Sequence, residues 1–193
     1  GIQNENEPEE PARPTELDGG FAIIVDEEFD RDASGFIEPS EGRWVVTGGT
    51  DSSTATPWQV RMYAPVGFFA LTPLTSIGES LVRTTGLSSS DALARVNAAF
   101  GLGDTNLSHL NPLNEMLAGN SAAALAYVRH VQVINTAVQI AEFWHGVQPS
   151  FDIAFFADRV YEDMAEKIST ENSTLDLSQP EVVREILNSI AVS

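Results

Sequence analysis

The sequence predicts an α+β fold in which a small antiparallel β unit precedes an all-α region. Short β-branched and apolar runs, separated by Gly, Pro, Ser and Asp, fill residues 20–71, as is typical of short strands. From residue 72, apolar residues recur at helical spacing behind Ser, Thr and Pro start signals. Strands and helices in separate runs indicate α+β rather than a doubly wound sheet. We therefore divide the chain into an acidic tail (1–19), a β-rich unit (20–71) and a helical region (72–193).

The composition excludes several classes of partner. The chain has 193 residues, of which 42% are hydrophobic, so it is large enough to bury a core. It carries 28 acidic and 10 basic residues, for a net charge of -18, which argues against nucleic acid and against anionic membrane surfaces. Either a salty habitat or bound cations would account for this charge. The chain has no cysteine, which excludes disulfides and thiolate metal sites.

The first segment is polar, acidic and rich in proline. "GIQNENEPEEPARPTELDGG" has no signal-peptide pattern, so we expect a processed product or a fragment. Its composition is typical of a disordered tail or linker. Such a tail could lie along the sheet edge of a neighbouring copy and build a homo-oligomer or filament by strand addition. No apolar run reaches the roughly 20 residues that span a bilayer, so we expect no membrane insertion.

Four segments of the β-rich unit are predicted as strands. They are "FAIIV" (21–25), "RWVVTGG" (43–49), "PWQVRMYAP" (57–65) and "VGFFAL" (66–71). The third alternates, with Trp58, Val60 and Met62 on one face.

Helix signals follow in order. Pro73 suits the first helical turn and Gly86 the end of that helix, and serines at 88–90 open the next. "NPLNEMLAGN" is a short helix closed by Gly119, and residues 121–146 form a long one. The last two helices are predicted in "FDIAFFADRVYEDMAEKIS" (151–169) and "DLSQPEVVREILNSIAVS" (176–193), the latter with Ser178 as cap and Pro180 in its first turn.

The long helix has an apolar stripe that we expect to face the core. Its members are Leu125, Val128, Val131, Ile134 and Val138. Asn135 lies on this helix, and we expect its amide to bond the backbone of the "TPLT" turn at 72–75, or else to face solvent. We also expect an aromatic core cluster where the long helix ends, made of Phe143, Trp144, Phe151, Phe155 and Phe156.

The stretch "DRDASGFIEPSE" (30–41) matches the spacing of an EF-hand-type calcium loop. Such a loop supplies oxygen ligands at positions 1, 3, 5, 7, 9 and 12 and a glycine, here Gly35, at position 6. The corresponding ligands are Asp30, Asp32, Ser34, the backbone carbonyl of Phe36, Glu38 and Glu41. Ser34 replaces the usual Asp or Asn, so we expect a weak Ca²⁺ affinity, near 10⁻⁴ M by order of magnitude.

The segments around this loop are strand-like, so the sequence predicts a strand–loop–strand site rather than a helix–loop–helix site. Asp26, Glu27 and Glu28 lie just upstream, and one of them could replace a loop ligand. Magnesium suits so many carboxylates in a flexible loop less well than calcium. The alternative is an acidic hairpin loop that binds no metal.

Several stretches together resemble a module of large bacterial surface proteins and RTX- or VCBS-type adhesins. The resemblance rests on the loop, "VVTGGTDSS", the "YAP" strand, "TPLTSI", "LSSSDALARVNAAFGL", "NPLNEMLAGN" and "DLSQPEV", and it covers residues 20–190. It implies an extracellular, cell-surface, calcium-binding structural or adhesive module and no enzymatic activity. Ser34 and "TPLTSI" depart from the pattern.

The other candidate site residues do not indicate a function. The three histidines, His109, His130 and His145, share no metal-ligand spacing, and no catalytic motif is present. Two rival interpretations remain. One is a carbohydrate- or ligand-binding module that uses Trp44, Trp58 and Tyr63 as platforms. The other is an enzyme with convergent, strongly perturbed acids.

Overall fold

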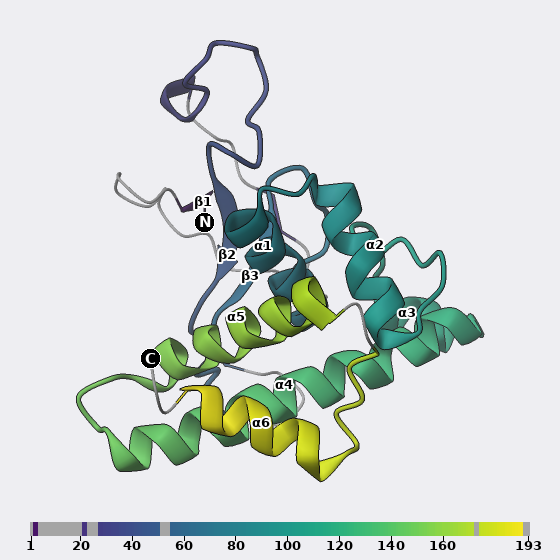
Figure 1. Ribbon diagram of the computed structural model, residues 1–193. Coiled ribbons are helices and arrows are strands. Elements are labelled where there is room, and N and C mark those ends of the chain that lie inside the picture. Colours follow the sequence, from purple (N-terminus) through teal and green to yellow (C-terminus); the bar gives the residue numbers. More distant parts are fainter. Residues whose placement is uncertain (1, 4–20, 23–26, 51–54, 172–173, 191–193) are drawn as a thin grey trace.

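The computed structural model has the predicted order of a small antiparallel sheet followed by helices (Figure 1). It describes residues 2–3, 21–22, 27–50, 55–171 and 174–190. The sheet has the order β1-β2-β3, formed by β1 (Ile2–Gln3), β2 (Arg43–Val46) and β3 (Met62–Pro65). The predicted α+β class is thereby confirmed.

The helices begin and end close to where the sequence signals lie. They are α1 (Pro73–Thr85), α2 (Ser89–Phe100), α3 (Pro112–Leu117), α4 (Ser121–Val147), α5 (Ile153–Glu171) and α6 (Pro180–Ile190). Pro73 is in the first turn of α1, and Gly86 ends it with a φ of 71°, a left-handed conformation that favours glycine. Ser88 caps α2 by accepting the N–H of Asp91. Ser178 bonds Asp176 through its hydroxyl instead of capping α6.

Among the described residues, two strand predictions are confirmed and one is wrong. β2 and β3 lie within "RWVVTGG" and "PWQVRMYAP", but "VGFFAL" is not a strand. Pro65 ends β3 and Gly67, at a φ of 90°, turns the chain, which leaves Phe69 73% exposed. Of "FAIIV", residues 23–25 lie outside the described part of the chain, as do 4–20 of the tail.

One apolar core joins the β unit to the helices. Val60, just before β3, packs in the same buried cluster as Leu74 and Ile77 of α1, Val133 of α4 and Tyr161 of α5. In Figure 1, α1 lies against the sheet, while α4, α5 and α6 form a layer below it. The sheet is therefore anchored to the helical body through α1.

The long helix α4 buries a different face from the one its sequence suggests. Leu125, Val128 and Val131 are 40%, 50% and 38% exposed, so the predicted stripe is wrong along its first half. The fully buried positions are Ala123, Ala126, Val133, Ala137 and Ala141. Alanines let neighbouring helices approach closely, since helix separation depends on the side chains at the contact.

Two further predictions about the helices need correction. Asn135 is exposed, so it does not bond the "TPLT" turn, and that turn is held by its own side chains. The rings of Phe151 and Phe155 stack at 4.6 Å, but Phe143, Phe151 and Phe155 are 52%, 43% and 39% exposed. Of the predicted aromatic cluster, only Phe156 is fully part of the core.

Candidate metal centre

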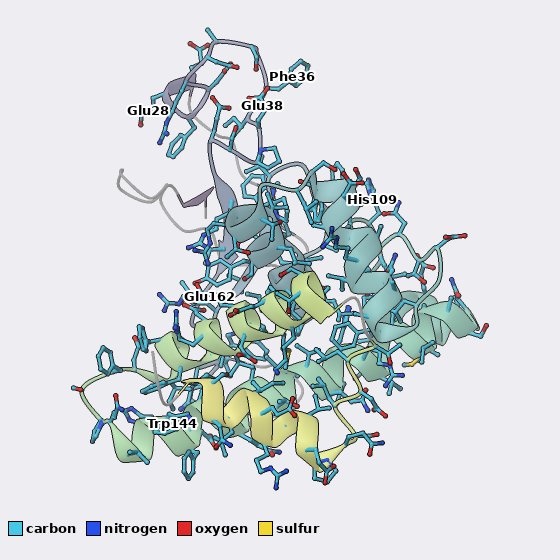
Figure 2. All side chains as sticks on the ribbon, viewed as in Figure 1. Glu28, Phe36, Glu38, His109, Trp144 and Glu162 are labelled. Atoms are coloured by element: carbon cyan, nitrogen blue, oxygen red, sulfur yellow. The ribbon has the colours of Figure 1, made fainter. Side chains whose placement is uncertain are left out.

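The acidic loop projects from the end of the sheet, away from α4–α6 (Figures 1 and 2). A short 3-10 helix, η1 (Glu27–Phe29), leads into it and β2 follows it. Phe29 is buried at the base of the loop, whereas Phe36 at its tip is 78% exposed. Glu27 and Glu28 are exposed, and Asp26 lies outside the described residues. Glu28 and Glu38 are both seen on this projecting segment in Figure 2.

The structure brings together three carboxylates that are distant along the loop. One oxygen from each of Asp30, Asp32 and Glu41 lies within 4.8 Å of the other two. Calcium binds oxygen at about 2.3–2.6 Å, so two ligands of one ion are at most about 5 Å apart. The first, third and twelfth loop positions therefore fit around a single ion of this size.

The backbone of the loop holds the first two carboxylates in place. Asp30 accepts the N–H groups of Ser34 at 3.0 Å and of Gly35 at 2.7 Å. Asp32 accepts the same Ser34 N–H at 3.0 Å. Gly35 has a φ of 86°, which allows the tight turn that brings its N–H to Asp30.

Glu41 is the buried member of the group, at 7% exposure. One of its carboxylate oxygens accepts the backbone N–H of Arg31 at 2.7 Å and that of Asp32 at 3.3 Å; the other accepts that of Glu38 at 3.0 Å. Each carboxylate oxygen has two lone pairs, so the oxygen that accepts two N–H groups is fully used, and only the other keeps acceptor capacity for a cation.

The remaining predicted ligands, Ser34, Phe36 and Glu38, lie close to one another, but Glu38 is not part of the group formed by Asp30, Asp32 and Glu41. The Ser34 hydroxyl lies 3.0 Å from the carbonyl oxygen of Phe36 and 2.9 Å from Glu38 Oε1. Glu38 Oε2 is buried, and no N–H or hydroxyl group donates to it. Either a proton shared with the Glu41 side chain or a bound cation would compensate its charge. The residues present therefore fit a calcium ion.

The two glutamates at the end of the loop differ in acidity. Hydrogen bonding to the Glu41 side chain raises the pKa of Glu38. The backbone N–H of Glu38 lowers the pKa of Glu41. Without a cation, a proton is thus favoured between these side chains, and a cation would compete with it.

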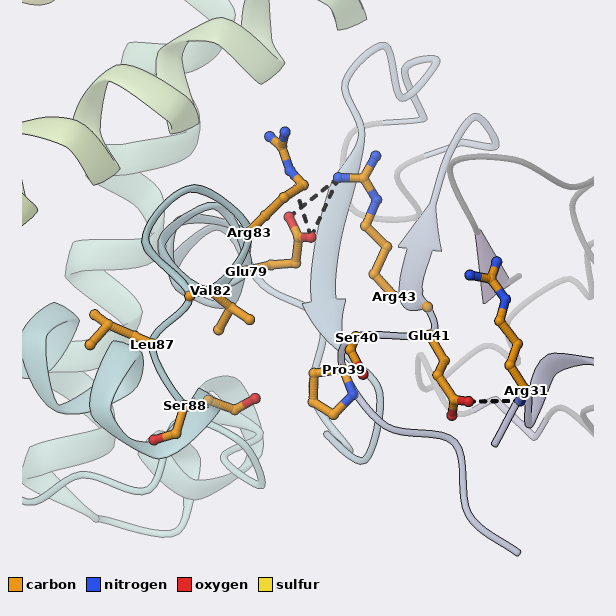
Figure 3. A pocket seen from close by; sticks show the side chains of 13 residues that line it. Arg31, Pro39, Ser40, Glu41, Arg43, Glu79, Val82, Arg83, Leu87 and Ser88 are labelled. Atoms are coloured by element: carbon orange, nitrogen blue, oxygen red, sulfur yellow. Dashed lines mark hydrogen bonds and ion pairs between the residues drawn. The ribbon is translucent and has the colours of Figure 1, made fainter. Parts of the chain in front are cut away.

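A groove of about 660 Å³ lies beside the base of the loop (Figure 3). Arg31 and Glu41 line it from the loop, and Glu79 and Arg83 from α1. Glu79 is 6% exposed and pairs with Arg43 at 3.3 Å, and burial raises its pKa despite the nearby arginines. Sequence reasoning missed this groove because its residues are up to 58 positions apart, from Arg31 to Ser89, with no local motif.

A second charged cluster ties β3 to α5. Asp158 accepts from Arg61 at 2.7 Å and from the Tyr63 hydroxyl at 3.0 Å. Burial raises the pKa of Asp158 to about 6, against the opposing effect of Arg61. The Arg43 guanidinium stacks 4.2 Å above the Tyr63 ring. No sequence pattern marked these residues as partners.

The aromatic platforms considered for a ligand site are not an exposed row. Tyr63 is 5% exposed, and Trp44 and Trp58 are half-buried. Trp44 packs edge-on against Phe21 with ring centroids 6.2 Å apart.

The histidines are dispersed. His109 lies 4.7 Å from the Phe69 ring, and His145 shares a hydrogen bond with the Phe151 carbonyl oxygen. His130 is buried in α4, and burial lowers its pKa to about 4. Among the described residues, no histidine joins the carboxylates that could hold a metal.

Comparisons with models of protein families, with curated proteins and with solved structures found no match to this chain. Within the part of the chain that the structure describes, no helix is long and apolar enough to cross a bilayer.

Proposed function

We propose that this chain is a non-enzymatic, calcium-binding structural or adhesive module of a bacterial surface protein, located outside the cell. The observation that carries the calcium proposal is that one oxygen from each of Asp30, Asp32 and Glu41 lies within 4.8 Å of the other two. The buried Oε2 of Glu38, to which no N–H or hydroxyl group donates, supports it. The resemblance to adhesin modules supports the surface location, and the net charge of -18 suits a calcium-rich medium.

In this role the ion would stabilise the projecting loop and the start of β2. The loop has little apolar burial apart from Phe29, so its order depends on compensating its carboxylates. The module would assemble with other copies into a homo-oligomer or filament through its N-terminal segment.

The test is thermal unfolding with calcium, with magnesium and with EDTA. A ligand at 100 times its Kd stabilises by about 2.7 kcal/mol, which raises the Tm of a chain this size by roughly 5–10 °C. With a Kd near 10⁻⁴ M, calcium at about 10 mM reaches that ratio. Glu41→Gln should abolish the rise, while the matched change Glu28→Gln, at an exposed carboxylate outside the cluster, should keep it. An equal Tm in calcium and EDTA would refute the calcium site.

The groove beside the loop favours one alternative, a carbohydrate- or ligand-binding module. Its volume lies in the usual range for ligand sites, and Arg31 could pair with a carboxylate-bearing sugar, whereas Arg43 and Arg83 already pair with Glu79. Titration calorimetry with oligogalacturonate on wild type and Arg31→Ala tests this alternative. Saturable binding that Arg31→Ala weakens at least about tenfold would favour it over a purely structural role.

A further inference from the structure

The most exposed large apolar side chain among the described residues lies at the tip of the projecting loop. Phe36 is 78% exposed, although the loop around it is ordered by backbone bonds to Asp30 and Glu41. Figure 2 shows its ring directed away from the loop. An aromatic side chain can bury about 150–250 Å² when it meets a partner surface. Phe36 therefore has the form of an anchor for another surface.

A pocket of about 350 Å³ on the sheet has the complementary form. The rings of Phe21, Phe69 and His109 line it, and Val46 and Met62 line it from the strands. The Phe69 and His109 rings lie 4.7 Å apart, and Phe69 is 73% exposed. Aromatic rings pack edge-on or offset with centroids about 4.5–7 Å apart, so these walls suit a further ring.

The charge of its lining distinguishes this pocket from two others. None of the described residues that line it is acidic, whereas the groove beside the loop includes Glu41 and Glu79, and a pocket beside α2 includes Asp104. The loop that carries Phe36 is acidic, and the whole chain has a net charge of -18. Like charges that meet at an interface cost affinity, so an acidic loop binds best to a surface without carboxylates.

The ring and the pocket are separated in one molecule by the length of β2. The loop precedes Arg43, the first residue of β2, whereas the pocket includes Val46, the last. Because Phe36 is exposed, it does not fill the pocket of its own chain. A contact between two different surfaces of the same molecule is head-to-tail, and it repeats along an open row of copies.

We propose that Phe36 of one copy inserts into the pocket lined by Met62, Phe69 and His109 on the next copy. The inference rests on the proposed assembly into a homo-oligomer or filament and deepens it, since it names a contact that does not involve the N-terminal segment. One ring buries much less area than the roughly 1,200–2,000 Å² of a stable interface, so we expect a weak contact, with a Kd of order 1 mM. Such a contact assembles copies that are concentrated together, as on one surface.

Calcium is placed to hold the ring in position. The carbonyl oxygen of Phe36 is the predicted seventh-position ligand, and the N–H of the preceding Gly35 donates to Asp30 at 2.7 Å. An ion bound there would fix the backbone on both sides of the Phe36 Cα. We therefore expect calcium to favour insertion and EDTA to disfavour it.

The first test measures mean mass by small-angle X-ray scattering at about 0.05–2 mM protein, in calcium and about 0.15 M salt to screen charge. We expect the mass of wild type to rise with concentration and that of Phe36→Ala to stay at one chain, because the contact weakens at least about tenfold. The matched control is Leu117→Ala, which removes an apolar side chain of α3 that is 75% exposed and should assemble like wild type. All three chains have the same net charge, so their mutual repulsion is equal.

The second test mixes two variants that each lack one half of the contact. Phe69→Glu places a carboxylate in the pocket wall and keeps Phe36, whereas Phe36→Ala keeps the pocket. Each variant alone should stay a single chain, and their equimolar mixture should form dimers and nothing longer. Phe69→Tyr keeps an aromatic wall and should assemble like wild type. If Phe69→Glu does not fold by circular dichroism, His109→Glu, at an exposed wall position, takes its place.

Three results would overturn the inference. One is a wild type that stays a single chain up to about 2 mM. Another is a mixture of the two variants that forms no dimers. The third is equal assembly of Phe36→Ala and wild type, which would leave the N-terminal segment as the contact of the proposed assembly.

The effect of calcium is scored separately. A Tm that rises with calcium, together with assembly that is equal in calcium and EDTA, would overturn calcium control of the ring while leaving the metal site intact. A Tm that does not respond to calcium would refute the metal site, and the two variants would then decide the insertion of Phe36 by themselves.

Discussion

The projecting loop and the helical body are ordered by different forces. In the body, Leu74, Ile77 and Leu81 of α1 are completely buried against other helices and the segment before β3. In the loop, order comes from backbone N–H groups bonded to the carboxylates of Asp30 and Glu41. Apolar burial does not depend on ions or pH, whereas a carboxylate cage does. The body should therefore keep its fold without calcium, at a lower Tm, whereas the loop should lose its order.

The largest loss of unfolding free energy is expected from a substitution in the helical body. Leu74→Ala removes a fully buried side chain and should cost about 3–4 kcal/mol of unfolding free energy, equally in calcium and EDTA. The matched change Leu125→Ala, at a side chain 40% exposed, should cost under about 1 kcal/mol. Chemical denaturation measures both. A large cost for Leu125→Ala would mean that the exposed face of α4 is covered in solution.

A buried histidine gives the body one acid-sensitive position. The folded pKa of His130 is about 4, below the ordinary 6.5, so its stabilising contribution is present above pH 6.5 and is lost as the pH falls toward 4. The loss is at most about 3 kcal/mol. Denaturation at pH 7 and pH 4.5 should therefore show a smaller acid loss for His130→Leu than for wild type.

Protonation of Asp158 has the opposite effect on stability, so Asp158 serves as the comparison for His130. Its folded pKa of about 6 lies above the ordinary 3.8, so its protonation adds stability as the pH falls from 6 toward 3.8. Asp158→Asn removes that gain and should lose more stability in acid than wild type does. If both variants follow the wild-type pH curve, neither group titrates as its burial implies.

Local signals predicted the helices well, because helix ends are set by neighbouring residues. Pro73 and Gly86 bound α1 as expected, and Ser88 caps α2. The buried face of α4 was predicted wrongly because large apolar residues dominate a hydropathy pattern. The fully buried residues of α4 are instead mostly small ones such as Ala137.

The candidate site likewise has features that the local sequence predicts and features that depend on tertiary packing. The spacing from Asp30 to Glu41 predicted that Asp30, Asp32 and Glu41 meet, since a short loop with a glycine turn constrains its own geometry, but Glu38 is not part of that group. The pairing of Arg61 with Asp158, 97 residues apart, and that of Arg43 with Glu79 depend on tertiary packing. Asn135 was assigned the role of tying the two halves together, but α1 does this with Thr75 and Ser76.

A medium effect is expected at the junction between sheet and helix. Thr75 is fully buried, and its hydroxyl serves the N–H of Thr72 and the carbonyl oxygen of Tyr63. Thr75→Val keeps the shape but leaves the Thr72 N–H without its acceptor and the Tyr63 carbonyl oxygen with only the 3.4 Å bond from Ser76, at a cost of about 2 kcal/mol. Thr84→Val, an exposed threonine of the same helix, should cost under about 0.5 kcal/mol by denaturation. Equal costs would show that the edge bonds of β3 do not stabilise the fold.

The smallest effects sharpen the account of the loop. Calcium loops tune affinity by ligand charge, so Ser34→Asp, which adds a carboxylate at the fifth position, should tighten calcium binding by about tenfold in titration calorimetry.

Phe36→Ala changes a side chain that is 78% exposed but keeps the backbone carbonyl of the seventh position. Its affinity should stay within about twofold of wild type, since a backbone ligand is indifferent to its side chain. A tenfold loss in Phe36→Ala would place the ligand set elsewhere in the loop, whereas a gain confined to Ser34→Asp would support the assigned positions.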